Sequence, residues 1–517
     1  MLTFLTRRVV VSILVLLAAS FLVYLLSASS GDPLATLRTS TARNKEEQIH
    51  AKILLLHLNV PLGLRYFIWL WGVIEGLWGQ LDLGHSLTGQ PVTSMLATAV
   101  GVTVQLLLAS TILAIVFGVI IGITSALRQY SGYDYTVTFL AFLFFSLPSF
   151  FVAVILKAYV GIAYNNFLQD PTIAPWLLIG LPLLSGAIWQ GILGGDAKRR
   201  WLIFGIAAIV TFGVLFYISA THWLDNPGLG IGVVLVLSVG LGLLIVVLTT
   251  GIENRKSLYT ALTVAAIATL LYYPIVGPGG LTHVVLFNIW SVLGLGVVAI
   301  GVGILVGYLF AGPDRWLSAR TGGITALLSS GLLLIDRFMQ DFQAYSTQIV
   351  NGRPIATVGS ATPNLATYTS SFWIQGLDSF THLLLPTISL MLISLAGYSR
   401  YSRANLLDVL NQDYIRTARA KGLNERTVVM RHAFRNSLIP LTTIVAFDIG
   451  ALVGGAIVTE TVFAWSGMGQ LFDQALNSTD VNPLMGYFIV TGVIIVLFNI
   501  FADLVYSVLD PRIRVTV

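Results

Sequence analysis

Few side chains in this 517-residue chain could carry out chemistry, because only 10% of its residues are charged. Three carboxylates, Asp448, Glu460 and Asp503, fall within or beside long apolar runs, where an ionisable group costs roughly 2.5–3.5 kcal/mol on insertion scales. Such groups can relay ions or protons across a membrane, or can hydrogen-bond to a neighbouring helix. Asp503 is expected to reach interfacial water, whereas for the more deeply placed Asp448 both roles stay open.

Other signatures of catalysis are missing from the sequence. No G-x-x-x-x-G-K-[ST] phosphate-binding loop occurs, since the chain contains no Gly-Lys pair. No H-E-x-x-H motif occurs, and seven histidines without any cysteine form no pattern of metal ligands. We therefore expect a chain that is not an enzyme and binds no metal. Any active work would draw on an ion gradient or on another subunit.

Composition predicts an all-α, polytopic membrane protein. Hydrophobic residues make up 56% of the chain, the mean hydropathy is +0.85, and apolar runs of about 20 residues recur, enough to cross ~30 Å of hydrocarbon. The net charge of +5 does not indicate nucleic-acid binding, because the basic residues lie in short loops between apolar runs. Spans are predicted at residues 9–28, 99–127, 136–160, 174–194, 201–220, 228–251, 258–277, 285–311, 321–335, 382–400, 438–459 and 484–508.

Charge placement gives these twelve spans an orientation. With the N-terminus inside, most Lys and Arg residues fall on the inside, including the turns at 198–200, 255–256 and 315–320. An even number of spans then places both termini in the cytoplasm. The N-terminus imitates a signal peptide, but its apolar run is longer than usual for one, so an uncleaved first span is favoured.

Two long segments are expected outside the membrane. Residues 29–98 include a polar helical stretch at 44–58 and an aromatic one at 66–78, whose tryptophans favour the membrane interface over a ligand platform. Residues 336–381 are rich in Ser, Thr, Asn and Gln and are expected to form an extracytoplasmic loop. Between about 165 and 340, three helical hairpins are predicted.

The longest basic segment, residues 412–440, lies between two apolar runs. With Arg403 just upstream it holds seven Arg and Lys residues, so it is expected on the cytoplasmic side. Asp413 is predicted to cap a short helix that ends at Ala420, and Gly422 to stop that helix in a left-handed conformation. Asn424 is predicted to cap a second helix with Glu425 in its first turn.

Two capped helices are more than a topology signal needs. The segment could be a basic loop that only fixes topology or touches anionic lipid, but we favour a docking element. Tyr414, Ala418 and Lys421 are spaced to share one helical face, which we predict to dock into a partner. Pro440 is predicted to lie where the next span begins, a position that proline tolerates.

The run from Asp413 to Pro440 resembles the cytoplasmic loop of binding-protein-dependent ABC importer permeases, specifically the dipeptide/oligopeptide group. The resemblance covers about residues 1–165 and 370–517. Its further matches lie at 31–33 (GDP), 82–86 (DLGHS), 146–150 (SLPSF), 382–386 (HLLLP), 460–463 (ETVF), Trp465, 467–469 (GMG), 482–484 (NPL) and 509–512 (LDPR).

The resemblance implies six spans, a second permease subunit, two ATP-binding subunits that carry ATP and Mg²⁺, and an extracytoplasmic solute-binding protein. No cofactor is expected on this chain itself. Pathway candidates are Pro148, Asp448 and Glu460. The coupling helix would comprise Asp413, Tyr414, Arg416, Thr417, Ala418, Arg419, Ala420, Lys421 and Gly422.

The chain departs from the family pattern at three places. Arg416-Thr417-Ala418 stands where the family has a Glu-Ala-Ala signature, and Ser466 stands where many relatives have proline. The largest departure is the middle, where about 200 residues intervene between the third span and His382. On the twelve-span map these residues add six spans, so the C-terminal part keeps its orientation.

We therefore expect a six-span permease core with about six inserted spans. The predicted divisions are an N-terminal permease part at 1–165, inserted hairpins and an outer loop at 166–370, and a C-terminal permease part at 371–517 with a coupling loop at 401–437. The expected function is the transmembrane subunit of an ABC importer for peptides. The alternatives are an ion-coupled secondary carrier, or a permease of the same group for sugars or nickel.

Overall fold

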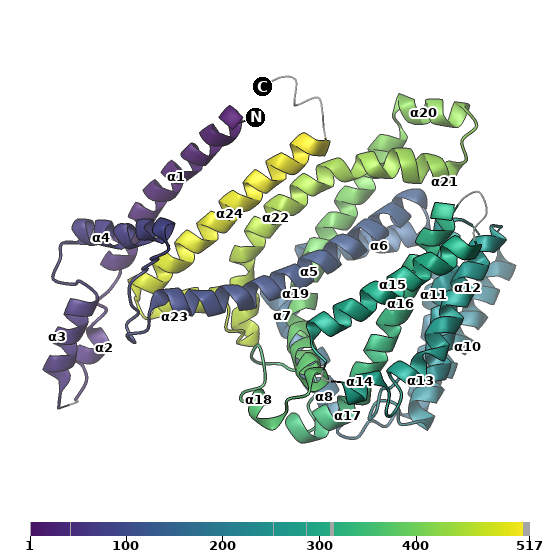
Figure 1. Ribbon diagram of the computed structural model, residues 1–517, viewed down its shortest axis with the longest axis horizontal. Coiled ribbons are helices and arrows are strands. Elements are labelled where there is room, and N and C mark those ends of the chain that lie inside the picture. The colour runs from purple at the N-terminus through teal and green to yellow at the C-terminus, as the bar shows by residue number, and fades with distance from the viewer. Residues whose placement is uncertain (1, 42, 252, 286, 311–314, 510–517) are drawn as a thin grey trace.

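The computed structural model describes residues 2–41, 43–251, 253–285, 287–310 and 315–509, apart from the side chains of 2–5, 36, 426, 431, 439, 443, 446–447, 449–455 and 502–509. Within these ranges the chain is helical with short connections, and the sole β pairing is an isolated bridge between His85 and Pro91 (Figure 1). The predicted all-α class is confirmed. The chain forms a membrane protein in which long apolar helices run side by side.

One bundle contains the long helices from the two ends of the chain. Helices α5 and α19 make its most extensive contact, α22 packs on both α19 and α24, and α1 packs on α24. The members of this bundle are α1 (Leu2–Ser29), α5 (Val92–Leu127), α6 (Gly132–Ser146), α7 (Ser149–Ile155), α19 (Phe372–Leu410), α22 (Phe434–Phe463) and α24 (Val481–Leu509).

Small residues allow the close approach of α5 to α19. A Cβ atom at Gly118 would lie 2.8 Å from the Cβ of Tyr398, and one at Gly122 would lie 2.5 Å from the carbonyl oxygen of Ser399. Glycine is therefore required where the two backbones nearly touch. This is the usual way in which helices pack inside a bilayer, where no hydrophobic force drives helix against helix.

The middle of the chain forms the three predicted hairpins, which lie beside the first bundle in Figure 1. They are α9 (Pro175–Leu193) with α10 (Ala197–Ala220), α11 (Gly230–Thr249) with α12 (Arg255–Leu270), and α15 (Ile289–Phe310) with α16 (Arg315–Gln340). The last two hairpins pack into a four-helix group, which contacts the bundle through α16 and α19, whereas α9 contacts α6.

Ten helical stretches in the described residues, rather than twelve, are long and apolar enough to cross a membrane. The predicted span at 258–277 is not among them, because α12 has only 16 residues and rises about 24 Å. It ends before α13 (Tyr272–Ile275) and a Gly-Pro-Gly-Gly turn. The predicted span at 438–459 falls in α22, a 30-residue helix with several side chains outside the described set.

The predicted third span is broken at Pro148. Helix α6 ends at Ser146, and Leu147 is extended, the conformation that a following proline favours. The chain then continues as α7, a π-helical turn (Leu156–Ala163) and α8 (Tyr164–Leu168), which together form one of the ten apolar stretches.

The expected outer loop at 336–381 is wrong at both ends, since α16 runs on to Gln340 and α19 already begins at Phe372. Polar residues misled the prediction here because they find partners inside the protein. Asp336 is fully buried and accepts hydrogen bonds from the backbone N–H of Leu229 (2.5 Å) and the hydroxyl of Tyr272 (2.8 Å).

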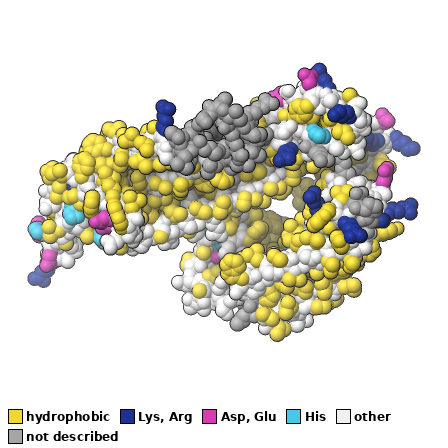
Figure 2. Space-filling view, turned by 45° about the horizontal axis from the view of Figure 1, so that its top comes forward, with side chains coloured by type: hydrophobic (Ala, Val, Ile, Leu, Met, Phe, Trp, Pro, Cys, Tyr) yellow, Lys and Arg dark blue, Asp and Glu magenta, His cyan; other side chains and the backbone are white. Residues whose placement is uncertain are grey.

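Short helices mark the two ends of the molecule. Figure 1 places α20 (Asp413–Ala420) at one end, together with the start of α1 and the end of α24. At the opposite end lie α2 (Ala35–Arg38), α3 (Lys45–Leu55), α14 (Leu281–Val284), α17 (Phe342–Ala344) and α18 (Leu365–Tyr368). In Figure 2, apolar side chains cover much of the visible face, and Lys and Arg gather toward the side of α20.

Candidate functional site

Helix α20 is the short helix predicted within the basic segment; it ends at Ala420 as predicted and begins one residue earlier than predicted, at Asp413. Its N-cap is Gln412 rather than Asp413, which lies in the first turn, where a carboxylate still suits the helix dipole. Gly422 has φ +76°, the left-handed conformation predicted for it. Asn424 caps the following helix by accepting a hydrogen bond from the backbone N–H of Thr427 at 2.8 Å.

The second helix does not stop after one turn. Helix α21 (Glu425–Thr427) continues through a π-helical turn (Val428–Ala433) directly into α22. Pro440 therefore lies inside α22 and not at the start of a span, which corrects the prediction. The tight glycine turn joins α20 to a long helix, so the position of α20 is fixed relative to the bundle.

One face of α20 packs against the protein itself. Ile415 is fully buried and Ala418 is 7% exposed, in a cluster with Ala126 of α5, Leu406 of α19 and Ala433. The expectation that Ala418 belongs to the docking face is thus wrong. The smallest side chain of the predicted face is used to bring α20 close to the bundle.

The opposite face of α20 is exposed, and the side chains at its centre are small. Asp413, Thr417 and Ala420 follow one another at helical spacing and are all exposed, with Arg416 and Lys421 beside them. Asp413 and Arg416 lie 3.6 Å apart with highly exposed side chains, so this ion pair contributes little stability. Tyr414 is partly exposed, and its hydroxyl accepts a hydrogen bond from Asn436 of α22 at 3.0 Å.

Arg419 closes the turn after α20. Its Nε and Nη2 donate to the two carboxylate oxygens of Glu425 at 3.0 and 2.6 Å, the two-pronged geometry that favours Arg over Lys. The hydrogen bond from Arg419 lowers the pKa of Glu425. Of the predicted coupling residues, Arg419 and Gly422 therefore hold the turn, Ala418 anchors the helix together with Ile415, which was not predicted, and the others remain accessible.

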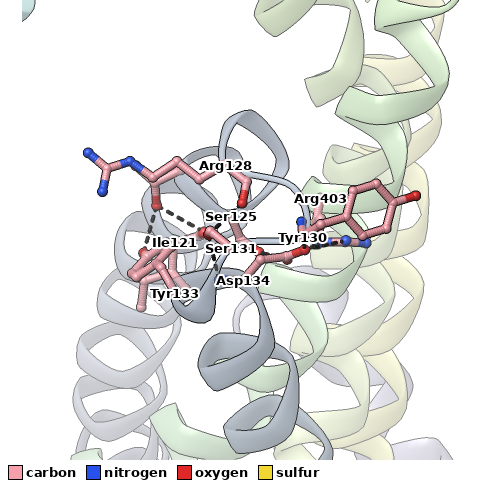
Figure 3. A network of polar contacts seen from close by, with 9 residues as sticks. Ile121, Ser125, Arg128, Tyr130, Ser131, Tyr133, Asp134 and Arg403 are labelled. Atoms are coloured by element: carbon pink, nitrogen blue, oxygen red, sulfur yellow. Dashed lines mark hydrogen bonds and ion pairs between the residues drawn. The ribbon is translucent and has the colours of Figure 1, made fainter. Parts of the chain in front are cut away.

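A second two-pronged pair lies where α19 leads toward α20. Arg403 of α19 donates through Nε and Nη2 to both oxygens of Asp134 at 2.8 and 2.9 Å (Figure 3). Asp134 also accepts hydrogen bonds from the hydroxyl of Ser125 and the backbone N–H of Tyr130. The pair thus ties α19 to the end of α5 and the start of α6. Sequence analysis counted Arg403 only as part of the basic block and missed Asp134.

The pathway candidate Glu460, in the last turn of α22, is fully buried, and its carboxylate lies at the start of a short helix, α23 (Met468–Asn477). Its carboxylate accepts hydrogen bonds from the Thr103 hydroxyl of α5 at 2.6 Å and from the backbone N–H groups of Gly469 and Gln470 at 2.7 and 3.2 Å. A Cβ at Gly467 would lie 2.5 Å from this carboxylate. The Glu-Thr-Val-Phe and Gly-Met-Gly motifs therefore form one packed corner.

The other pathway candidates have structural partners. Asp448 accepts hydrogen bonds from Ser394 at 2.9 Å and Tyr398 at 2.6 Å, both on α19, which is the helix-bonding role left open for it. The side chain of Asp503 lies outside the described residues. Pro148 marks the break between α6 and α7.

One intramembrane cation was missed by the sequence analysis. Lys157 donates to the carbonyl oxygen of Val462 at 2.6 Å, at the C-terminal end of α22, where the helix dipole favours a positive charge. Its signal was available as the lone lysine inside the predicted third span. Among the described residues, no group of three His, Cys, Asp or Glu side chains is placed to hold a metal ion.

The chain is similar in sequence to known transport proteins. Residues 352–515, which include α19, α20 and α22–α23, match the family described as binding-protein-dependent transport system inner membrane component. The oligopeptide transport system permease protein OppB of Mycobacterium tuberculosis is 25% identical over 513 residues, 99% of each chain. The protein AppB of Bacillus subtilis is 44% identical over 137 residues, and DppB of Escherichia coli is 43% identical over 138 residues.

The segment between the third predicted span and His382 is also present in at least one relative. The 137 residues shared with AppB are 26% of this chain and 43% of AppB, so AppB is much shorter, and DppB is similar in this respect at 27% and 41%. The mycobacterial OppB instead aligns along its whole length. The expectation that relatives lack the middle segment therefore does not hold for all of them.

The short exposed helix α20 and the long helices α19 and α22 that hold it all lie within the residues that match this family. Residues 352–515 thus resemble binding-protein-dependent transport system inner membrane components, and the chain is a multi-pass inner-membrane protein.

Proposed function

We propose that this chain lines the translocation pathway of an ABC importer for peptides, with α20 as the coupling helix that docks into an ATP-hydrolysing subunit. The geometry of α20 carries the proposal. Its inner face is anchored by Ile415 and Ala418, whereas Asp413, Thr417 and Ala420 present a narrow surface outward. A partner groove can approach closely over the small side chains of Thr417 and Ala420.

The remaining subunits follow from the same proposal. A second permease completes the pathway, two ATP-binding subunits hold ATP and Mg²⁺, and a solute-binding protein delivers substrate on the side opposite to α20. The side of α20 is then cytoplasmic and carries both chain termini. Peptides are favoured as substrate because relatives bear the names oligopeptide and dipeptide transport system permease.

A bulky residue on the outer face of α20 tests the coupling role. Ala420→Trp should lower both the amount of ATPase that co-purifies with the permease and ATP-driven uptake of a labelled oligopeptide into proteoliposomes. Ala366→Trp is the matched control, since Ala366 is an exposed alanine of α18, which lies at the opposite end of the molecule from α20 (Figure 1). Normal ATPase binding and normal uptake in Ala420→Trp would remove α20 from the coupling interface.

The rival functions give different results in the same vesicles. Uptake by this chain alone, driven by an ion gradient and unaffected by ATP, would identify a secondary carrier. Its relay would have to pass through groups such as Asp448, whose carboxylate is already hydrogen-bonded to α19. Competition by sugars or Ni²⁺, but not by unlabelled peptides, would assign the importer to another substrate.

A further inference from the structure

A cavity of about 440 Å³ lies between α12, α15 and α16. Its lining on α15 extends from Val292 to Gly303 and on α16 from Ala326 to Arg337, so it follows each helix for 12 residues, a rise of about 17 Å. That length is close to half of the ~30 Å hydrocarbon thickness of a bilayer. The cavity lies in the half of these helices that is farther from α20, toward α14 and α17 (Figure 1).

The cavity is built for an apolar guest that enters from the side. Apart from Thr282, Ser330 and Arg337, its lining consists of apolar side chains and glycines. Two lining residues, Leu293 and Val297, are also 53% and 69% exposed on the surface of α15. In a bilayer this opening faces hydrocarbon, so an acyl chain can fill the cavity without losing apolar contact.

A buried guanidinium lies at the end of the cavity that faces away from α20. The side chain of Arg337 is 5% exposed, and its plane lies over the Trp373 ring at 4.9 Å. Its Nη1 lies 3.1 Å from a carboxylate oxygen of Asp341, in an ion pair that lacks hydrogen-bond geometry. Neither Nη1 nor Nε has a hydrogen-bond acceptor among the described residues.

Unsatisfied donors on a buried charged group are costly, so an oxygen acceptor from outside the chain would stabilise them. The carboxylate of Asp336 cannot serve, because its acceptor sites are already taken by four donors: the backbone N–H groups of Leu229 and Gly230, the Tyr272 hydroxyl and the Gln340 amide. The geometry calls for a molecule with an acyl chain at one end and acceptor oxygens at the other.

We propose that this cavity binds one membrane phospholipid, with an acyl chain between α15 and α16 and the phosphate group on Arg337. In the orientation proposed above, this lipid belongs to the outer leaflet. Because Asp341 already balances much of the positive charge, the phosphate is recognised chiefly as a hydrogen-bond acceptor. The inserted hairpins thereby gain a function as a lipid-binding unit that is separate from the coupling helix.

Cavity filling tests the acyl-chain part. Nothing lies within 4 Å of a Cβ placed on Gly331, which lines the cavity, so Gly331→Leu should fold and occupy the space of the chain. Gly213→Leu on α10 is the matched control, because its Cβ would also meet nothing and Gly213 lies outside the cavity. Native mass spectrometry of the full-length chain should show one phospholipid fewer in Gly331→Leu than in Gly213→Leu.

Headgroup recognition is tested by titrating delipidated protein with phosphatidylglycerol. Arg337→Gln should bind roughly tenfold more weakly or worse, the effect of losing one charge-assisted hydrogen bond, and Arg337→Lys should recover part of the affinity. Palmitate should compete poorly with the phospholipid.

Equal lipid counts in Gly331→Leu and Gly213→Leu would overturn the proposal. So would unchanged phosphatidylglycerol affinity in Arg337→Gln, or a preference for palmitate. A second copy of the chain seated on this groove would appear as a dimer that Gly331→Leu dissociates, and would also overturn it. None of these readouts depends on ATP, so failure here leaves the importer proposal standing, and failure of the importer leaves this one standing.

Discussion

Arg403 and Asp134 join two helices that are 269 residues apart in the chain, through paired bonds of 2.8 and 2.9 Å. The Asp134 side chain is 4% exposed and that of Arg403 is 28% exposed. The pair holds the bundle together at the end where α20 lies, because it links the connection between α5 and α6 to the last turns of α19 (Figure 3). The position of α20 relative to α5 and α6 therefore depends on it.

Removing the Asp134 carboxylate should lower the free energy of unfolding of the chain. Asp134→Ala leaves the Arg403 charge without its partner, and we expect a loss of roughly 2–4 kcal/mol, below the full cost for a buried pair because Arg403 is partly exposed. Thermal unfolding of the purified chain in detergent measures the change. Asp408→Ala, at an exposed aspartate of the same helix α19, should leave the melting temperature unchanged. An equal melting temperature for both variants would deny the pair its structural role.

Glu460 should matter as a packing group of the corner that holds α23. Glu460→Ala removes the acceptor for the Thr103 hydroxyl and for the N–H groups of Gly469 and Gln470, each costing about 1–3 kcal/mol when left unsatisfied. We expect a strongly destabilised protein, measured by thermal unfolding. Thr461→Val is the control, because among the described residues the exposed Thr461 hydroxyl bonds only to the Ile457 carbonyl of its own helix.

The variant Glu460→Gln separates a packing role of Glu460 from a role in the translocation pathway. Glu460→Gln keeps an acceptor oxygen and should be milder than Glu460→Ala in stability. If the two variants were equally stable and only transport were lost, Glu460 would instead belong to the pathway.

Stability should fall as pH rises through the titration of Asp480. Burial raises the pKa of this carboxyl from 3.8 to about 6, even though the backbone N–H of Leu87 donates to it at 2.6 Å. Between pH 4 and 6 the folded protein holds a proton that the unfolded chain has released. The folded state is therefore favoured near pH 4, and this contribution is lost by about pH 6.

Asp480→Asn removes this dependence, because an amide carries no charge and its oxygen can still accept from Leu87. The variant should match the wild type near pH 4 and be more stable at pH 7 by about 1–3 kcal/mol. Melting temperatures at half-unit steps from pH 4 to 7 give the comparison. A difference that stays constant with pH would mean that Asp480 is not the titrating group.

The orientation can be tested by cysteine labelling, since the native chain contains no cysteine. Lys198→Cys, in the first turn of α10, should resist an impermeant maleimide in intact cells. Ser370→Cys, an exposed position between α18 and α19 on the opposite side, should react. The reverse pattern would invert the orientation and place α20 outside the cell.

The sequence by itself determined the membrane class, most of the long helices, and the bounds of α20 with its glycine turn. These features are local. Hydrocarbon thickness fixes the length of an apolar run, and a left-handed turn at Gly422 needs only the missing Cβ. The predictions failed where a local break overrode composition, as in α12 and at Pro148.

Only the tertiary structure decided which face of α20 points outward and which groups the carboxylates of Asp448 and Glu460 contact. Helical spacing placed Tyr414, Ala418 and Lys421 on one face, but it could not show that Ala126 and Leu406 cover Ala418. The sequence likewise left Asp448 between two roles until Tyr398 was found beside it. Such contacts join helices that are distant in the chain, so they depend on how the whole bundle packs and leave no periodic signal in the sequence.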